Sequence, residues 1–203
     1  MPTINEEAAL AEILPKLHQQ YDIIIVDGGS TDNTLVLARK YGARIIRQWG
    51  WGLVAAEVQG MNAATAGNEM CIVMDGDGQH DPDDIPVLLQ SSADLVIGAR
   101  TRRDDTAFRK LVSAGARWLA HTGLNDPTSG FRVYSARAVR YLMQDPPRHV
   151  DYLGQIEIIK KFRRAGLAID ERPVKFLKRV GGKSHLSATT ILHYALASVT
   201  DFA

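Results

Sequence analysis

Residues 71–81 read Cys-Ile-Val-Met-Asp-Gly-Asp-Gly-Gln-His-Asp, an apolar run that ends in two aspartates separated by one glycine. The run predicts a buried strand, and alternate residues of an extended segment share a face, so Asp75 and Asp77 can point the same way. Mg²⁺ takes one or two carboxylates and completes its shell with phosphate and water, so the pair predicts a metal site that also holds substrate phosphates. The alternative is a polar turn, in which Asp and Gly are common.

A second apolar run has the same kind of ending. Residues 21–26, Tyr-Asp-Ile-Ile-Ile-Val, lead into Asp27-Gly-Gly-Ser-Thr-Asp32 and then into a helical pattern that ends at Gly42. Ser30 or Asp32 could cap this helix. Ligands of open α/β sheets bind outside the carboxyl ends of strands, so we expect the two acidic strand ends to form one site.

Length and composition limit the class of protein. With 203 residues, 45% hydrophobic and 23% charged, the chain is expected to fold as one soluble globular domain. The single cysteine, Cys71, excludes a disulfide within the chain and is expected to be a core thiol. No apolar run approaches the roughly 18 residues of a membrane span, and no signal peptide is recognisable at the start. We therefore expect a cytoplasmic location and no nucleic-acid partner.

The charges are divided unevenly along the chain. Residues 1–99 hold 5 basic and 14 acidic residues, a net charge of −9, and residues 100–203 hold 19 and 9, a net charge of +10. An acidic half can hold metal and a basic half can meet phosphates or an anionic membrane surface. The alternative is that the two halves neutralise each other in the fold.

Strand and helix patterns alternate along the chain, which predicts a mostly parallel sheet flanked by helices in a single α/β domain. The predicted strands are 21–26, 43–47, 69–74, 94–99, 130–134 and 167–173. The predicted helices are 6–19, 33–41, 53–66, 82–91, 107–121, 136–143, 152–165 and 187–200. Asp81 before Pro82, and Ser135, are the expected N-caps of two of these helices.

Six short motifs occur in a fixed order: Pro-Thr-x-Asn-Glu, Val-Asp-x-Gly-Ser-Thr-Asp, Asp-x-Asp-x-Gln-His, Gly-x-Arg, Asp-x-x-Ser-Gly-Phe and Arg-x-Gly-Gly-x-Ser. They lie at 2–6, 26–32, 75–80, 98–100, 126–131 and 179–184. Each alone is a weak signal, but the ordered set over about 185 residues is specific. The chain resembles the family 2 glycosyltransferases of the GT-A (Rossmann-like) fold, and within them the dolichyl-phosphate mannose synthase group.

The resemblance implies a role for each matching position. The residues expected to bind the donor nucleotide are Pro2, Asn5, Glu6, Asp27, Asp32, Asp75 and Gly76. Those expected to hold Mg²⁺ or Mn²⁺ are Asp75, Asp77 and Gln79. Those expected to face an acceptor phosphate are Arg100, Arg109, Ser113, Arg179 and Lys183. Asp77, Asp126 and Arg109 are the candidate catalytic residues. The donor half would span about 1–99 and the acceptor half about 100–203.

Several of these residues also have structural explanations. Glu6 could be an acid favoured by a helix N-terminus. Arg109 could lie on a solvated helix face, and Arg179 and Lys183 could be exposed loop charges. Asp126, the candidate general base, could equally form an Asp-Pro turn.

The implied reaction is transfer of a sugar from a UDP- or GDP-linked donor to a polyprenyl phosphate with inversion at the anomeric carbon. The metal would neutralise charge on the leaving nucleoside diphosphate. A phosphate monoester is mostly dianionic at pH 7 and needs no strong base, whereas a sugar hydroxyl needs one. Two alternatives stay open: transfer to a soluble or glycan hydroxyl, and a non-catalytic nucleotide-sugar binding subunit.

The chain departs from the family pattern in several places. Gly28 replaces a common second aspartate, and Trp49-Gly-Trp-Gly52 replaces Lys-Gly-x-Gly; the indoles could stack on a base or sugar, although packing is the default role. Residues 1–7 resemble the end of a strand without the strand itself, so an added apolar segment of about 6–10 residues should raise stability. Residues 188–199 are mildly amphipathic. Such a segment could contact a membrane surface, or it could pack on the domain or on a second subunit in a homo-oligomer.

Overall fold

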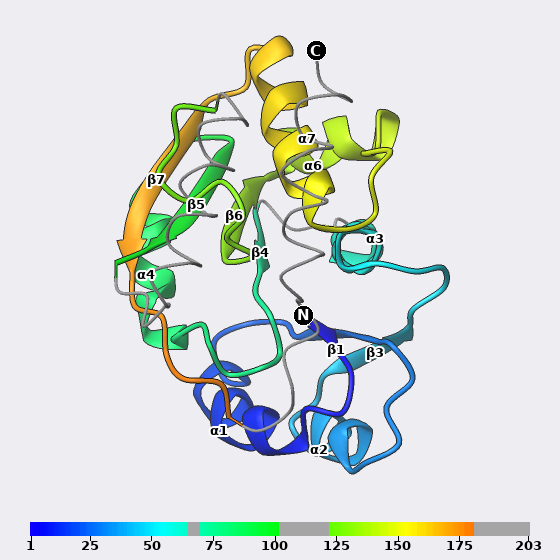
Figure 1. Cartoon of the computed structure of the whole chain (residues 1–203). Helices are drawn as coiled ribbons and strands as arrows, with labels where there is room; N and C mark the ends of the chain where they lie inside the picture. The colour runs from blue at the N-terminus through cyan, green and yellow to red at the C-terminus, as the bar shows by residue number, and fades with distance from the viewer. Residues whose placement is uncertain (65–69, 102–121, 181–203) are drawn as a thin grey trace, which may run out of the picture.

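The computed structural model describes residues 1–64, 70–101 and 122–180 (Figure 1). Three site candidates, Arg109, Ser113 and Lys183, lie outside the described residues, as do the predicted helices 107–121 and 187–200 and the 188–199 segment. Among the described residues, no helix has the length and apolar character needed to cross a membrane.

The strands form two sheets. The first is wholly parallel, in the order β1-β2-β3. Its strands are β1 (Pro2–Thr3), β2 (Ile24–Asp27) and β3 (Arg44–Arg47). Val26 is paired with Pro2 on one side and with Ile46 on the other. The carboxyl ends of β1, β2 and β3 therefore lie at one edge of this sheet.

The second sheet is mixed, in the order β4-β6-β5-β7. Its strands are β4 (Met70–Val73), β5 (Leu95–Arg100), β6 (Arg132–Ser135) and β7 (Ile169–Val174). The pairing of β5 with β7 is parallel, as predicted, whereas β6 runs antiparallel to both β4 and β5. Parallel pairing thus holds in the first sheet and at one edge of the second.

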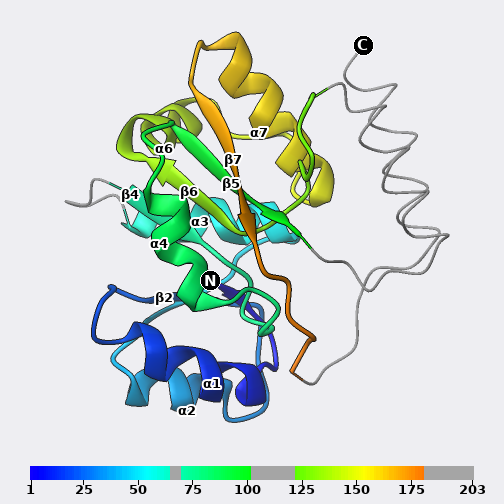
Figure 2. The same cartoon turned by 90° about the vertical axis from the view of Figure 1, so that its left-hand side faces the viewer.

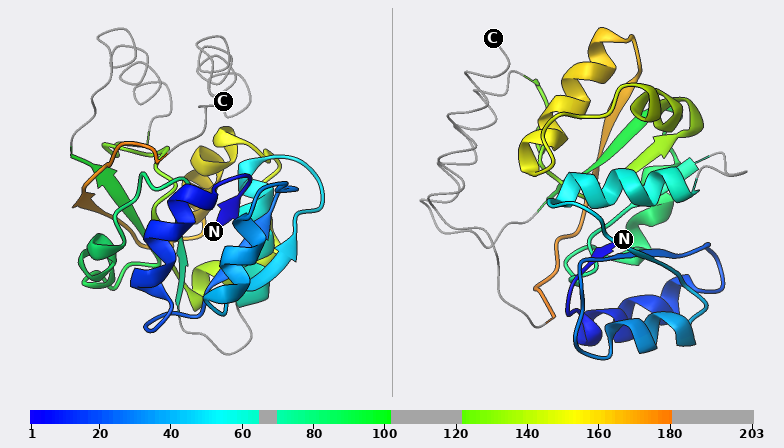
Figure 3. Two further views of the ribbon diagram at one scale, coloured as in Figure 1. Left: turned by 90° about the horizontal axis from the view of Figure 1, so that it is seen from below. Right: turned by 90° about the vertical axis from the view of Figure 1, so that its right-hand side faces the viewer.

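Helices cover both faces of the sheets (Figures 1 and 3). One apolar core lies on the side of α1 (Glu7–Leu17), α2 (Thr34–Lys40) and α4 (Ile85–Leu89), which follows a 3-10 turn at Pro82–Asp84. The other lies on the side of α3 (Leu53–Ala64), α6 (Ala136–Gln144) and α7 (Tyr152–Arg164). The predicted caps Asp81 and Ser135 are confirmed, since their side chains accept from the backbone N–H groups of Asp83 and Ala138.

The two-residue strand β1 is the junction between the sheets. Its Pro2 pairs with Val26 of β2, and on the other side the Pro2 carbonyl accepts a hydrogen bond from Gly76 N–H at 3.3 Å. A Cβ on Gly76 would lie 2.7 Å from Thr3 Oγ1, so glycine is required for this approach. The two residues of β1 thus lie between β2 and the segment that follows β4.

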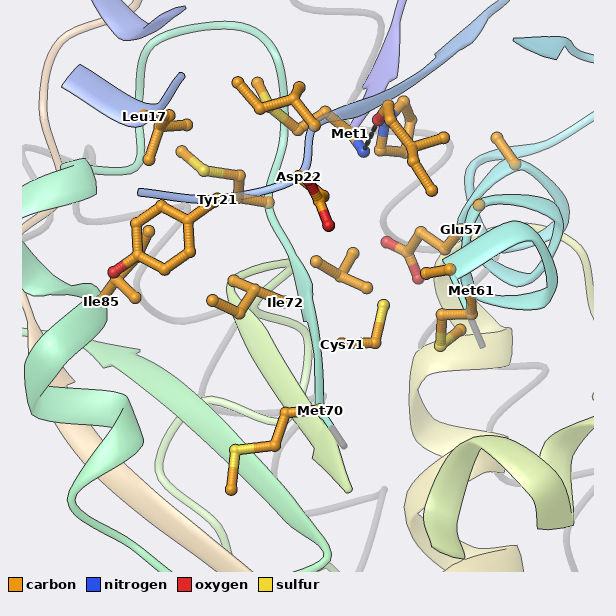
Figure 4. A pocket seen from close by; sticks show the side chains of 18 of the residues that line it. Met1, Leu17, Tyr21, Asp22, Glu57, Met61, Met70, Cys71, Ile72 and Ile85 are labelled. Atoms are coloured by element: carbon orange, nitrogen blue, oxygen red, sulfur yellow. Dashed lines mark hydrogen bonds between the residues drawn. The ribbon is translucent and has the colours of Figure 1, made fainter. Parts of the chain in front are cut away.

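A cavity of about 310 Å³ lies at the amino end of β1, between β2 and β4 (Figure 4). Its lining is mostly apolar, including Leu17, Met61 and Ile72, with the Glu57 carboxylate pointing in from α3. The stabilising effect of an added strand here stays a prediction.

Candidate functional site

The loop after β2 is organised by the Asp27 carboxylate. Asp27 is buried, and its oxygens accept hydrogen bonds from the backbone N–H groups of Gly29 at 3.1 Å and Ser30 at 3.0 Å. Gly29 has φ of 104°, which favours glycine and turns the chain back onto the carboxylate. Asp27 therefore shapes the loop at the strand end where a nucleotide is predicted to bind.

The loop after β1 is hydrogen-bonded to the loop after β2. Asn5 has φ of 53°, its Oδ1 accepts from Thr31 N–H at 2.7 Å, and its own N–H donates to Ser30 Oγ at 3.0 Å. Asp32 accepts from Thr34 N–H at 2.9 Å and from Glu7 N–H at 3.3 Å. The N-cap of α2 is Asn33, so the prediction of Ser30 or Asp32 as the cap is wrong, although Asp32 does accept from the first N–H of the helix. These contacts join two of the predicted donor-binding segments.

Glu6 lies next to the acidic residues of the second sheet. Partial burial raises its pKa to about 7, helped by the negative charges of Asp77, Asp32 and Asp75, while Arg179 opposes the shift. Glu6 is therefore close enough to acidic groups after β2 and after β4 to interact with both, and a single shared site stays a prediction.

Asp75 has an unsatisfied carboxylate oxygen. Its Oδ1 is buried and has no hydrogen-bond partner among the described residues, and Oδ2 lies 3.9 Å from His80 Nε2. Burial and the neighbouring Asp77 raise the pKa of Asp75, and His80 and Arg100 oppose this. A Cβ on Gly130 would be 3.0 Å from the carboxylate, so Gly130 leaves the space in which Asp75 sits.

His80 is a neutral support for Asp75. The Asp75 N–H donates to His80 Nδ1 at 3.1 Å, so that nitrogen is unprotonated and Nε2 carries the hydrogen. Burial lowers the pKa of His80, and its ring stacks on Phe131 with centroids 5.0 Å apart. Neither His80 nor Gly130 was predicted as a site residue, although both lie within the motifs on which the family resemblance rests.

Asp77 is satisfied on both oxygens. Oδ1 accepts from Gln79 N–H at 3.0 Å, and Oδ2 accepts from Arg179 Nη2 at 2.5 Å. The Asp77 residue is only 6% exposed, so the arginine neutralises an otherwise buried charge. Arg179, predicted to face an acceptor phosphate, thus pairs with a predicted metal ligand, and its role toward phosphate stays a prediction.

Arg179 belongs to a segment, residues 175–180, that we call the strap. Figure 2 shows it in orange, leaving the end of β7 and running toward α1. Leu177 N–H donates to the Gln79 carbonyl at 2.9 Å and Val180 N–H to the Asp77 carbonyl at 3.3 Å. The strap therefore lies against the acidic motif and is tied to its backbone.

Arg100 and Asp126 form a second ion pair at the end of β5. Asp126 Oδ2 accepts from Arg100 Nε at 2.5 Å and Oδ1 from Arg100 Nη2 at 2.6 Å, a bidentate arrangement. The Arg100 guanidinium also lies over the Phe176 ring of the strap. Both Asp126 oxygens thus already accept a hydrogen bond from Arg100. The roles of Asp126 as general base and of Arg100 as phosphate ligand stay predictions.

The loop that carries Asp126 and Gly130 rests on a buried arginine that the sequence analysis missed. Arg132 is fully buried and donates to the carbonyls of Ser129 at 2.7 Å and Pro127 at 2.6 Å. It follows directly after the Asp-x-x-Ser-Gly-Phe motif, and its charge gave no hint of burial because arginine is usually exposed.

The donor set fits a divalent cation. Among the described residues no group of three or more His, Cys, Asp or Glu side chains forms a closed metal cage. What the site offers is the partnerless Asp75 oxygen and the Asp77 carboxylate, and an open set of one or two carboxylates suits a cation that shares its shell with phosphate. The part of the Gln79 side chain in such a site stays a prediction.

The two tryptophans after β3 are not packed. Trp49 is 75% exposed and Trp51 is 89% exposed, so the packing interpretation is wrong for both. The Gln59 side chain holds the Trp49 backbone through its N–H at 3.2 Å and its carbonyl at 2.6 Å. Stacking on a ligand therefore stays open for these rings.

Comparisons with known proteins agree on the class. The model of the family "Glycosyl transferase family 2" matches residues 1–140. An undecaprenyl-phosphate mannosyltransferase of Micrococcus luteus is 31% identical over 98% of this chain and 90% of its own length. A dolichol-phosphate mannosyltransferase of Pyrococcus furiosus is 29% identical over 96% of this chain, which spans 60% of that protein.

A solved structure shares the fold. Glucosyl-3-phosphoglycerate synthase from Mycobacterium tuberculosis, in complex with Mn²⁺, UDP-glucose and phosphoglyceric acid, superimposes with a TM-score of 0.76. It is 21% identical over 98% of this chain and 78% of that chain, a likeness that establishes the α/β fold of the GT-A glycosyltransferases. With the family match over most of its length and the mannosyltransferase relatives, the chain belongs to glycosyl transferase family 2 and is a glycosyltransferase.

Proposed function

We propose that this glycosyltransferase moves a sugar from a nucleoside diphosphate sugar to a polyprenyl phosphate, with a divalent metal and with inversion. The observation that carries the proposal is the charge arrangement at the sheet edge. Asp77 pairs with the guanidinium of Arg179, Asp75 has a partnerless buried oxygen, and Arg100 lies at the end of β5. Such a site can accept a cation and two phosphate groups together. The relatives named for undecaprenyl and dolichol phosphate support the acceptor class.

Different segments of the chain would bind the nucleoside and the metal. The loops after β1 and β2, which Asn5 joins and Asp27 shapes, would receive the nucleoside at the parallel strand ends. Asp75 and Asp77 would hold the metal, which when bound neutralises charge on the leaving diphosphate. Mg²⁺ and Mn²⁺ both suit carboxylate oxygens.

The arginines would hold the acceptor. A guanidinium fork matches phosphate oxygens, so Arg100 could orient the acceptor phosphate for in-line attack, and Arg179, which lies at Asp77, could contact the phosphates of both donor and acceptor. A dianionic phosphate needs no strong base, so the locked Asp126 carboxylate is compatible with this acceptor. A hydroxyl acceptor would need Asp126 to be released from Arg100 before it could take a proton.

A thermal-shift screen tests the donor half of the proposal. UDP- and GDP-sugars are added with and without Mn²⁺, and a ligand at 100 times its dissociation constant should stabilise by about 2.7 kcal/mol. For a chain of this size that is roughly 5–10 °C in Tm. Asp77→Asn, which keeps an acceptor for Gln79 N–H, should fold normally and lose the metal-dependent part of the shift.

Transfer of radiolabelled sugar tests the acceptor half. The donor that gives a shift is incubated with a polyprenyl phosphate, a soluble phosphate ester and a glycan. Product with the lipid phosphate alone supports the proposal, and product with the glycan alone would replace it by the hydroxyl-acceptor alternative. A metal-dependent donor shift without any product would favour a binding subunit.

A further inference from the structure

The Arg179 guanidinium occupies one oxygen of Asp77, a candidate metal ligand. Its Nη2 lies 2.5 Å from Asp77 Oδ2, while Oδ1 is taken by the N–H of Gln79. We propose that Arg179 is a placeholder for the metal: its guanidinium neutralises Asp77 in the free protein and yields this oxygen when a metal and a diphosphate bind together. The inference rests on the proposed function, because it takes Asp77 as a metal ligand.

The acidic cluster needs such a counter-charge. Asp77 is 6% exposed and lies close enough to Asp75 and Glu6 for their charges to act on one another. Several carboxylates that share a poorly hydrated site repel one another unless a cation is present. Arg179 attracts both Asp77 and Glu6, so it supplies that cation from within the chain.

The guanidinium can leave without unfolding the strap. The strap is held by the backbone bonds of Leu177 to Gln79 and of Val180 to Asp77. The Val180 side chain also lies close to Gly78 and packs against the apolar core on the side of α1. None of these contacts uses the Arg179 side chain, which can therefore turn from Asp77 to a phosphate while the backbone stays in place.

The exchange has a thermodynamic signature. A metal that arrives alone must displace Arg179 and leave the guanidinium without its carboxylate, so binding is weak. A metal that arrives with a nucleoside diphosphate offers Arg179 phosphate oxygens, for which a guanidinium fork is well suited. Arg179 therefore opposes the metal alone and favours the metal–diphosphate pair, which couples the two ligands.

The test is Mn²⁺ binding, measured from the electron paramagnetic resonance signal of the free ion, alone and with UDP or GDP. Arg179→Met should bind Mn²⁺ alone about tenfold more tightly than the wild type, because one competing charged hydrogen bond is gone. In the presence of the nucleoside diphosphate that binds, the order should reverse by a similar factor. Lys178→Met removes the same charge from the exposed neighbouring position of the strap and should change both affinities by less than about twofold.

Two outcomes would overturn the inference. Arg179→Met and Lys178→Met could affect Mn²⁺ alike, which would mean a general charge effect, or Arg179→Met could leave binding of Mn²⁺ alone unchanged or weaker. Melting curves of each variant verify that the fold is kept. Asp77→Asn separates this from the proposed function: if it binds Mn²⁺ as the wild type does, with and without nucleotide, the metal site itself is wrong; if it loses Mn²⁺ while Arg179→Met changes nothing, only the placeholder role fails.

Discussion

Asp27, the last residue of β2, and Asp77, which follows β4, both lie at strand ends, yet they are held in different ways. Asp27 is bound by the backbone N–H groups of Gly29 and Ser30, two and three residues away. Asp77 is bound on one oxygen by the N–H of Gln79 and on the other by the side chain of Arg179, 102 residues away, and Asp126 is likewise paired with the side chain of Arg100. Backbone partners cannot be exchanged for a ligand without reshaping the loop, whereas side-chain partners can. The loop after β2 is thus fixed by its own backbone. The ion pairs beside the second sheet can instead be exchanged for contacts with a ligand.

The largest expected effect concerns the ion pair between the side chains of Arg100 and Asp126. Asp126→Ala should destabilise the protein by about 3 kcal/mol, because the mostly buried Arg100 loses its partner. The double variant Arg100→Met/Asp126→Ala should recover a clear part of that loss, as measured by urea unfolding. Additive losses would mean that the two side chains act independently and that the pair is no unit.

The second prediction concerns the junction between the two sheets, which is formed by only the two residues of β1. An apolar extension of about six residues before Met1 would continue β1 into the cavity between β2 and β4. We expect a gain of about 2 kcal/mol, or roughly 4–8 °C in Tm, from burial of apolar side chains. A Gly/Ser extension of equal length is the control, and equal Tm values for both would contradict the prediction.

Removal of the Asp27 carboxylate, whose partners are backbone groups, should have a smaller effect that a second substitution cannot restore. Asp27→Ala should cost about 1–2 kcal/mol, because the N–H groups of Gly29 and Ser30 lose their acceptor. Donor affinity should fall with it, and a calorimetric titration of the nucleotide measures this. Wild-type donor affinity in the variant would show that the loop after β2 does not contact the nucleotide.

The last effect is a pH dependence set by Glu57, which lines the cavity between the two sheets. Burial raises its pKa to about 8 from a normal value of 4.5, so the folded protein binds this proton more tightly than the unfolded chain. The free energy of unfolding should therefore fall as the pH rises between these values. Glu57→Gln should flatten the dependence in urea titrations at pH 5 and pH 8, and the exposed Glu12→Gln should not.

The same contrast explains what the sequence could predict. Apolar runs that end in Asp27 and Asp75 placed both strand ends correctly, and the helix caps at Asp81 and Ser135 were confirmed because caps are local. The reversed direction of β6 was not predicted, since alternation of strands and helices says nothing about which strands become neighbours.

Long-range partners were also beyond prediction. The pairing of Asp77 with Arg179 depends on the strap crossing the acidic motif, and the burial of Arg132 depends on the carbonyls of the loop before it. Neither leaves a periodic trace in the sequence. Residue types pointed to the right chemistry at these positions, but the identity of each partner came only from the fold.

The junction at β1 also has a mechanical consequence. The two sheets meet through Pro2 and Thr3, with Gly76 N–H donating to the Pro2 carbonyl, whereas β5 and β7 are in register over six residues. A force that pulls α2 away from α7 would load this short junction before it loads either sheet. The molecule should therefore extend first by parting the sheets, and each half should yield only at a higher force.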